Sequence, residues 1–225
     1  MYDIILMDLD NTILDFDAAE REGFLKIIEK AGLRYSDDLL EDYKRINSAL
    51  WYELEQGIVT KEVVLNTRFE KFFQLYGITT DGIRWEKEYR SYLDNSSGLV
   101  PFAKDTLIGL KRMGKKIYSA SNGVYETQLK RLSNAGIIQF FDGHFISDKI
   151  GYEKPSPSFF NFCLKHVGNY PKKTILMVGD SPTSDILGAT HSEIDSCFYQ
   201  HNKQVTCLDA TYTIDTMSKL LDIVS

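Results

Sequence analysis

The sequence predicts an α/β protein with a parallel β-sheet covered by helices on both faces and a helical domain inserted after the first strand. Three observations favour this fold class. Short apolar runs alternate with helical spacing from residue 115 onward, an apolar run stands at the front of the chain, and residues 16–93 contain no convincing strand. Ligands of such sheets bind beyond the carboxyl ends of the strands, so the polar residues after each strand deserve inspection.

Five runs have the composition of strands, and most end in glycine or polar residues. They are residues 3–9, 116–120, 143–147, 173–178 and 196–200. Three stretches between the later strands have the apolar spacing of helices, namely residues 126–135, 157–167 and 185–191. Because strand and helix alternate, neighbouring strands are expected to run parallel.

Residues 16–93 predict four amphipathic helices. Their expected limits are Asp17 to Gly32, Ser36 to Gly57, Thr60 to Gly77, and a last helix that begins near Asp81. In the first helix, Asp17 and Glu20 have the spacing of a capping box. The polar run at residues 94–98 is expected to return the chain to the sheet. The predicted domains are a core of residues 1–15 and 98–225 and a helical cap domain of residues 16–97.

Composition excludes several classes of protein. With 43% hydrophobic and 26% charged residues, the chain has globular proportions, and its net charge of −6 disfavours a surface for long nucleic acids. The longest apolar runs are strand-sized, and the amino-terminal residues lack the features of a signal peptide. We therefore expect a cytoplasmic protein with no membrane partner. The three cysteines match neither a disulfide framework nor a Cys-x-x-Cys site.

The first candidate site residues stand at the end of the first strand, in the run Asp8-Leu9-Asp10-Asn11-Thr12. Side chains alternate along a strand, so Asp8 and Asp10 would share a face unless a turn re-aims them. Two crowded carboxylates are unfavourable unless one is protonated or a metal lies between them. The competing interpretation is that Asp10 and Thr12 only cap a turn.

Asp180 follows the strand near residue 175 and is expected at the same edge of the sheet. Oxygen ligands from Asp8 and Asp180, completed by a backbone carbonyl and water, would suit Mg²⁺ better than Zn²⁺. The alternative is that the Asp180-Ser181 segment is a helix N-cap.

Two further residues could bind an anion. Ser121 directly follows the strand at residues 116–120. Its hydroxyl and the following backbone N–H groups could seat a phosphate, although Ser121 could also be an ordinary N-cap. Lys154 precedes Pro155, which stiffens the backbone and could direct the ammonium toward the acidic residues. A lysine in a loop is otherwise usually exposed to solvent.

Taken in order, these motifs resemble those of the haloacid dehalogenase superfamily of phosphohydrolases: Asp8 to Thr12, Ser121 with Asn122, Lys154, and Asp180 with Asp185. The resemblance covers essentially the whole chain and implies a Rossmann-like, doubly wound core, a Mg²⁺ cofactor and an aspartyl-phosphate intermediate. Dehalogenating members typically replace the second acid of the first motif, whereas Asp10 is present here, which favours phosphoryl transfer.

The resemblance also implies a role for each motif residue. It makes Asp8 the nucleophile and Asp10 the general acid and base, with Mg²⁺ held by Asp8, Asp180 and the Asp10 carbonyl. Ser121, Asn122 and Lys154 are then expected to bind phosphate. Asp185 is then expected to orient a metal-bound water or Lys154. Thr12, like Asp185, is expected to contact the site residues without reacting itself.

Local features look like those of bacterial pyrimidine 5'-nucleotidases: residues 15–17, 50–51, 66–69 and 121–124. The implied substrate is a small phosphorylated molecule such as a nucleoside monophosphate, and the implied state is a monomer or homodimer. The cap domain is expected to close over the site. Trp51 and Arg68 are candidate contacts to base or sugar, although each could equally be structural.

Other functions stay open. A sugar-phosphate phosphatase or phosphomutase of the same superfamily would use the same motifs, and isomerised product would identify the mutase. A dehalogenase is disfavoured by Asp10. A receiver-like signalling module also combines a phosphorylated Asp, Mg²⁺ and Lys, but it needs only about 120 residues and no cap.

Overall fold

The computed structural model describes all residues, 1–225, and divides the chain into two compact units. One unit combines Met1–Phe16 with Ser97–Ser225, and the other is Asp17–Ser96. The corresponding limits predicted from the sequence are residues 15 and 98. We describe each unit by itself.

The larger unit is built on a six-stranded sheet with the order β3-β2-β1-β4-β5-β6. Every neighbouring pair of strands is parallel, as predicted. The strands are β1 (Ile4–Met7), β2 (Lys116–Ser121), β3 (Gly143–Ile146), β4 (Ile175–Gly179), β5 (Asp195–Tyr199) and β6 (Tyr212–Ile214). The strand order reverses between β1 and β4, which is the switch point where doubly wound sheets bind ligands. The predicted count of five strands is wrong, because β6 has only three residues, two of them exposed, and so lacks a strand-length apolar pattern.

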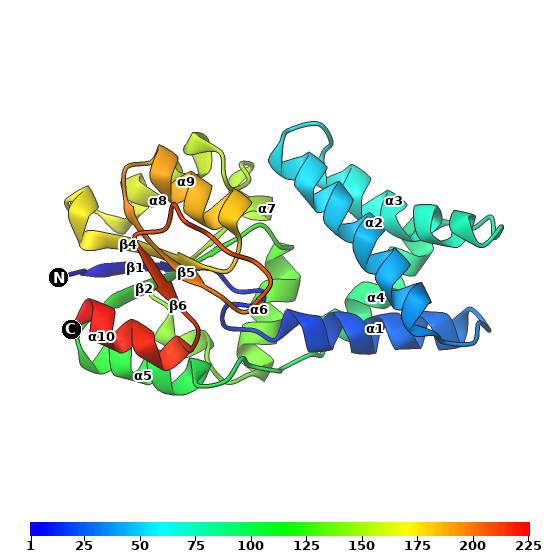
Figure 1. Cartoon of the computed structure of the whole chain (residues 1–225), viewed down its shortest axis with the longest axis horizontal. Helices are drawn as coiled ribbons and strands as arrows, with labels where there is room; N and C mark the ends of the chain where they lie inside the picture. The colour runs from blue at the N-terminus through cyan, green and yellow to red at the C-terminus, as the bar shows by residue number, and fades with distance from the viewer. The chain divides into compact units, whose positions relative to one another are not determined.

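Apolar side chains leave both faces of the sheet, so two separate cores form. Ile5 and Met7 pack on one face, and Ile4 and Leu6 pack on the other. Figure 1 shows α5 and α10 along one face and α8 and α9 along the opposite face. The helices of this unit are α5 (Ala103–Arg112), α6 (Tyr125–Asn134), α7 (Ser147–Ile150), α8 (Pro157–Val167), α9 (Leu187–His191) and α10 (Leu220–Val224). This double covering is the Rossmann-like architecture that the sequence predicts.

The predicted helix at residues 185–191 is only partly correct. A π-helical turn, Pro182–Ile186, comes first, and α9 follows it. The wider turn places Asp185 at its fourth position, facing back toward β4, where Gly179 lies. Single π-helical turns of this kind are common at functional sites.

The smaller unit contains the four predicted helices, α1 (Phe16–Lys30), α2 (Asp37–Glu55), α3 (Lys61–Leu75) and α4 (Gly82–Asp94). Ser36, Thr60 and Asp81 cap the last three of them by accepting backbone N–H bonds. The predicted capping box of the first helix is wrong, because α1 begins before Asp17 and the buried Glu20 carboxylate accepts a bond from the Asn47 amide at 3.0 Å. No helix of either unit is both long and apolar enough to cross a membrane.

The chain leaves and re-enters the larger unit at adjacent positions. The Asp15 N–H donates to the Gly98 carbonyl at 3.0 Å, and Leu14 pairs with Leu99 in an antiparallel bridge. The two ends of the inserted segment are therefore hydrogen-bonded to each other within the larger unit, shortly after β1.

Candidate active site

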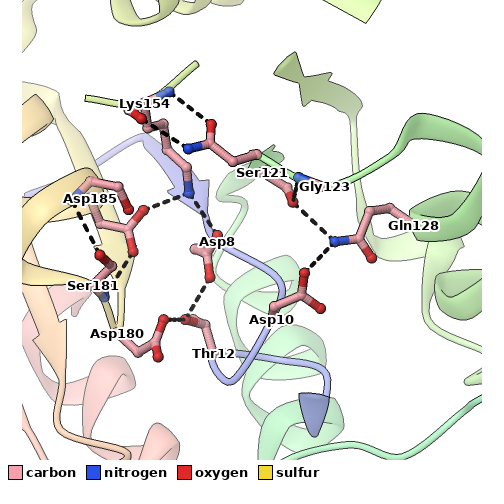
Figure 2. A network of polar contacts seen from close by, with 12 residues as sticks. Asp8, Asp10, Thr12, Ser121, Gly123, Gln128, Lys154, Asp180, Ser181 and Asp185 are labelled. Carbon is pink, nitrogen blue, oxygen red and sulfur yellow. Dashed lines mark hydrogen bonds and ion pairs between the residues drawn. The ribbon is translucent and has the colours of Figure 1, made fainter. Parts of the chain in front are cut away.

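The predicted site residues of the larger unit gather at the carboxyl ends of three adjacent strands. Asp8 follows β1, Ser121 is the last residue of β2, and Asp180 follows β4. Lys154 lies in the loop before α8 and reaches the same edge (Figure 2). The structure thus brings together residues that are far apart in the sequence.

A tight turn after β1 separates the two carboxylates of the first motif. The N–H groups of Ile13 and Leu14 both donate to the Leu9 carbonyl, at 2.9 and 2.8 Å. Asn11 lies in the left-handed region with φ of 58°, a conformation that asparagine tolerates better than most residues. Because the chain turns here, Asp8 and Asp10 point to different partners (Figure 2).

Asp8 is nearly buried and is held through both of its oxygens. The Lys154 ammonium donates to Oδ1 at 2.7 Å, and the Thr12 hydroxyl donates to Oδ2 at 3.0 Å. The two donors fix the plane of the carboxylate. Each oxygen keeps a further lone pair for a metal or for bond formation.

Lys154 is 2% exposed and is positioned by its own backbone. The Lys154 N–H donates to Asn122 Oδ1 at 2.8 Å, and Asn122 Nδ2 donates to the Lys154 carbonyl at 2.9 Å. This reciprocal pair ties the loop before α8 to the end of β2. The structure therefore shows the Asn122 amide bonded to the Lys154 backbone, and a direct phosphate contact by Asn122 stays a prediction.

Asp185 lies behind the lysine. Its Oδ1 accepts from the Lys154 ammonium at 2.6 Å, and its Oδ2 accepts from the Ser181 N–H at 3.1 Å. A Cβ at position 179 would lie 2.1 Å from Asp185 Oδ2, so only glycine there lets the carboxylate approach β4. Asp185 therefore contacts Lys154 directly, and its supporting role in catalysis stays a prediction.

The oxygen atoms at the end of β1 and β4 fit a hard divalent cation. One carboxylate oxygen from each of Asp8, Asp180 and Asp185 lies within 4.8 Å of the other two, and the Thr12 hydroxyl is 3.0 Å from Asp8 Oδ2 and 3.5 Å from Asp180 Oδ1. Oxygen-only donor sets of this kind suit Mg²⁺. Asp8 and Asp180 are the predicted ligands in this group.

The charges of this group support a cation site. Three carboxylates face the single ammonium of Lys154, so that ammonium can neutralise only part of their negative charge. Burial, together with Asp185 and Asp10, raises the pKa of Asp8 to about 7 even though Lys154 opposes the shift. Burial followed by the charges of Asp8 and Asp185 raises the pKa of Asp180 well above its usual value. A divalent cation would relieve both shifts, because it stabilises the charged form of each carboxylate.

Lys154 stays charged in this environment. Burial alone would lower the pKa of its ammonium, but the carboxylates of Asp185 and Asp8 outweigh burial and raise the pKa. The lysine is therefore a permanent cation beside the candidate nucleophile.

Two residues outside the sequence motifs, Gln128 and Arg131, contact Asp10. Gln128 Nε2 donates to Asp10 Oδ2 at 2.6 Å, and Arg131 Nη1 forms an ion pair with Asp10 Oδ1. Both come from α6 and are 1% and 2% exposed. The sequence does hold a signal for this role: Gln128 and Arg131 are spaced i and i+3, so they share a helix face with the apolar Leu132. The signal is not specific, because amphipathic helices carry many polar residues with this spacing.

Ser121 lies between these groups and the lysine. Its Oγ accepts from the Gly123 N–H and from Gln128 Nε2, both at 3.0 Å. The predicted role of Ser121 in phosphate binding stays a prediction, and Figure 2 shows Ser121 in the same cluster as Asp8 and Lys154.

Trp51 and Arg68 belong to the helical unit. Trp51 is partly exposed and donates to Asn47 Oδ1 at 3.1 Å. Arg68 is 3% exposed, pairs with Glu86 at 2.6 Å and donates to Asn47 Oδ1 at 3.0 Å. Burial of Arg68 weighs against a substrate contact, which stays a prediction for both residues.

Replacing Arg68 with methionine is expected to destabilise the helical unit by about 3 kcal/mol, because Glu86 and Asn47 lose a buried partner. Both tryptophans, Trp51 and Trp85, lie in this unit, so urea unfolding followed by tryptophan fluorescence measures its stability directly. The exposed Arg45→Met is the matched control. A higher KM with unchanged unfolding would favour the substrate contact instead.

Comparison with known proteins places the chain in a family. The family model described as haloacid dehalogenase-like hydrolase matches residues 2–192. The HAD-hydrolase YfnB of Bacillus subtilis is 33% identical over 100% of this chain and 96% of its own length. The pyrimidine 5'-nucleotidase PynA of Streptococcus pneumoniae is 32% identical over 98% of this chain and 94% of its own length.

Solved structures agree with this placement. The crystal structure of YfnB bound to magnesium superposes with a TM-score of 0.95 and 33% identity, and the match covers 99% of this chain and 98% of that one. The sheet order, the insertion after β1 and the ordered motifs give the same result. The protein belongs to the haloacid dehalogenase-like hydrolases.

Proposed function

We propose that the protein is a Mg²⁺-dependent phosphomonoester hydrolase that acts on nucleoside 5'-monophosphates, with pyrimidine nucleotides preferred, through an aspartyl-phosphate intermediate. The observation that carries the proposal is the buried Asp8 carboxylate, held by Lys154 at 2.7 Å beside Asp180 at the switch point of the sheet. The nucleotide preference is supported by the similarity to PynA.

In the first step an oxygen of Asp8 attacks phosphorus, the new oxygen–phosphorus bond forms, and the bond to the ester oxygen breaks. Asp10 gives its proton to the departing oxygen. Lys154 and Ser121 offset the negative charge on the transferring group. When bound, Mg²⁺ supplies further positive charge at the phosphoryl oxygens.

In the second step Asp10 takes a proton from water, the water oxygen attacks phosphorus, and the bond to Asp8 breaks. Free phosphate leaves, Asp8 is a carboxylate again, and Asp10 again carries the proton that it gave up in the first step. Asp185 does not react; it holds Lys154 in place. We assign the helical unit to contacts with the part of the substrate that is not phosphate.

A phosphate-release panel tests the function. With Mg²⁺ present, we expect phosphate from nucleoside monophosphates, with the highest kcat/KM for pyrimidine nucleotides, and loss of activity in excess EDTA that added Mg²⁺ restores. Sugar phosphates and 2-haloacids complete the panel. Isomerised sugar phosphate would identify a phosphomutase, halide release a dehalogenase, and a single turnover without further release a signalling module.

The Asp10→Asn variant separates acid catalysis from metal binding. We expect a loss of about 10²- to 10⁴-fold for nucleotides and a smaller loss for p-nitrophenyl phosphate, whose leaving group needs little protonation. Mg²⁺ binding measured by calorimetry should persist, because only the Asp10 backbone carbonyl is assigned to the cation. Equal losses for the two substrates would contradict the assignment.

A further inference from the structure

Gln128 and Arg131 are two polar side chains that the proposed mechanism leaves without a role. They lie on α6 and are 1% and 2% exposed. Burying an amide and a guanidinium costs free energy unless hydrogen bonds compensate. Their bonds reach the two site residues whose orientation matters most, Asp10 and Ser121.

The first consequence concerns Asp10. Its Oδ2 accepts from Gln128 at 2.6 Å, and its Oδ1 accepts from Arg131. One donor alone would let the carboxylate rotate about its last torsion, whereas donors on both oxygens fix its plane. Each oxygen still has a second lone pair with which to exchange a proton with a leaving group or a water.

The second consequence concerns Ser121. Its Oγ accepts from Gln128 and from the Gly123 N–H, so both lone pairs are engaged and the hydroxyl hydrogen is left to be donated. A hydroxyl in this state is a donor to a phosphoryl oxygen. The same amide nitrogen of Gln128 therefore serves the acid–base residue and the phosphate seat, as Figure 2 shows.

The amide itself is fixed from two sides. Arg131 Nη1 donates to Gln128 Oε1 at 3.1 Å, which turns the NH₂ group toward Asp10 and Ser121. The amide also packs on Gly123, where an added Cβ would lie 2.5 Å from Gln128 Nε2. The side chain is thus close-packed in one orientation.

We propose that Gln128 and Arg131 are positioning residues: Gln128 orients the Asp10 carboxylate and makes the Ser121 hydroxyl a donor to phosphate, and Arg131 fixes both Gln128 and Asp10. The inference rests on the proposed phosphatase function. It deepens that function, because one face of α6 then orients the residue that protonates the leaving group and contributes part of the affinity for phosphate.

The test uses Gln128→Met, which keeps the length of the side chain and removes the amide. We expect kcat for nucleoside monophosphates to fall about 10- to 100-fold, p-nitrophenyl phosphate to be affected less, and inorganic phosphate to bind several-fold more weakly in calorimetry with Mg²⁺ present. Arg131→Lys should show the leaving-group dependence with a smaller loss. Glu126→Gln, an exposed change on the same helix, is the control.

Non-additivity with Asp10→Asn gives the sharper readout. In that background Gln128→Met should lower kcat for nucleotides little further, yet still weaken phosphate binding, because only the Ser121 contact remains to be lost. If Gln128→Met fails to fold by circular dichroism, Gln128→Glu keeps the volume and is expected to give the same kinetic pattern.

Two outcomes are distinct. If the wild-type protein releases phosphate but the Gln128 variants keep the wild-type ratio between substrates and wild-type phosphate binding, the positioning role is overturned and the proposed function stands. If the wild-type protein releases no phosphate from any ester, the proposed function falls, and this inference with it.

Discussion

The Asp8→Asn variant is expected to lose about 10⁴-fold or more in the rate of phosphate release, because an amide oxygen cannot act as the nucleophile. The fold should persist, since Asn matches the shape of Asp: its Oδ1 can still accept from Lys154, and its Nδ2 can donate to the Thr12 hydroxyl oxygen in place of the bond that Asp8 accepts. Phosphate release measured beside circular dichroism separates the two effects. Asp215→Asn, an exposed residue of the same unit, is the control.

The same variant has an expected effect on stability in the absence of metal. Burial raises the pKa of Asp8 in the folded protein to about 7, above its ordinary value of 3.8, so the folded state binds the proton more tightly than the unfolded state. The stability associated with this group is present at low pH and is lost as the pH rises from about 4 to about 7. Asn carries no such penalty.

In EDTA, the Tm of Asp8→Asn relative to wild type should therefore increase with pH up to about 7 and then level off. Mg²⁺ should raise the Tm of wild type more than that of the variant, because a carboxylate ligand has been removed. A variant that keeps full activity, or one whose relative Tm falls with pH, would contradict the assignment of Asp8.

Lys154→Met is expected to cost about 3–5 kcal/mol of stability at neutral pH and to abolish activity. The ammonium is the only cation paired with Asp8 and Asp185, at 2.7 and 2.6 Å, and both carboxylates are buried. Removing one partner of a buried ion pair leaves the other without compensation. Urea unfolding followed by circular dichroism measures the loss.

A second substitution checks the physical cause. Adding Asp185→Asn to Lys154→Met removes one of the stranded charges and should recover part of the stability without recovering activity. Lys111→Met, which breaks a half-exposed pair with Asp142, is the control and should cost less than about 1 kcal/mol. Equal losses for the two lysines would show that burial of Lys154 has no energetic consequence.

Much of the fold could be predicted because its signals are local. Helices α2 to α4 begin next to Ser36, Thr60 and Asp81, whose capping side chains and spacing are visible in the sequence. β1 and β4 are continuous apolar runs, which is what burial on both faces requires. The short strand β6 was not predicted, because three residues at the edge of a sheet are too few to show an alternation of apolar and polar residues.

The site was predictable in part for a different reason. Asp8, Ser121 and Asp180 each stand at the end of a predicted strand, so the topology of a parallel sheet places them at one edge. Gln128 and Arg131 come from within a helix, and their relevance depends on which turn of α6 faces Asp10. The capping box predicted from Asp17 and Glu20 failed for the opposite reason. Its pattern is local, but the Glu20 carboxylate accepts a hydrogen bond from Asn47 of another helix.

The hydrogen bond from Asp15 to Gly98 closes the inserted segment at its base. Because its two ends meet there, residues can be gained or lost within the segment without shifting the alignment of β1 on β2. We have proposed that the helical unit contacts the substrate and that residues of the larger unit break the ester bond. Selection can then change which ester is accepted without changing the residues that break it. Discrimination and chemistry can then evolve at different speeds along one polypeptide.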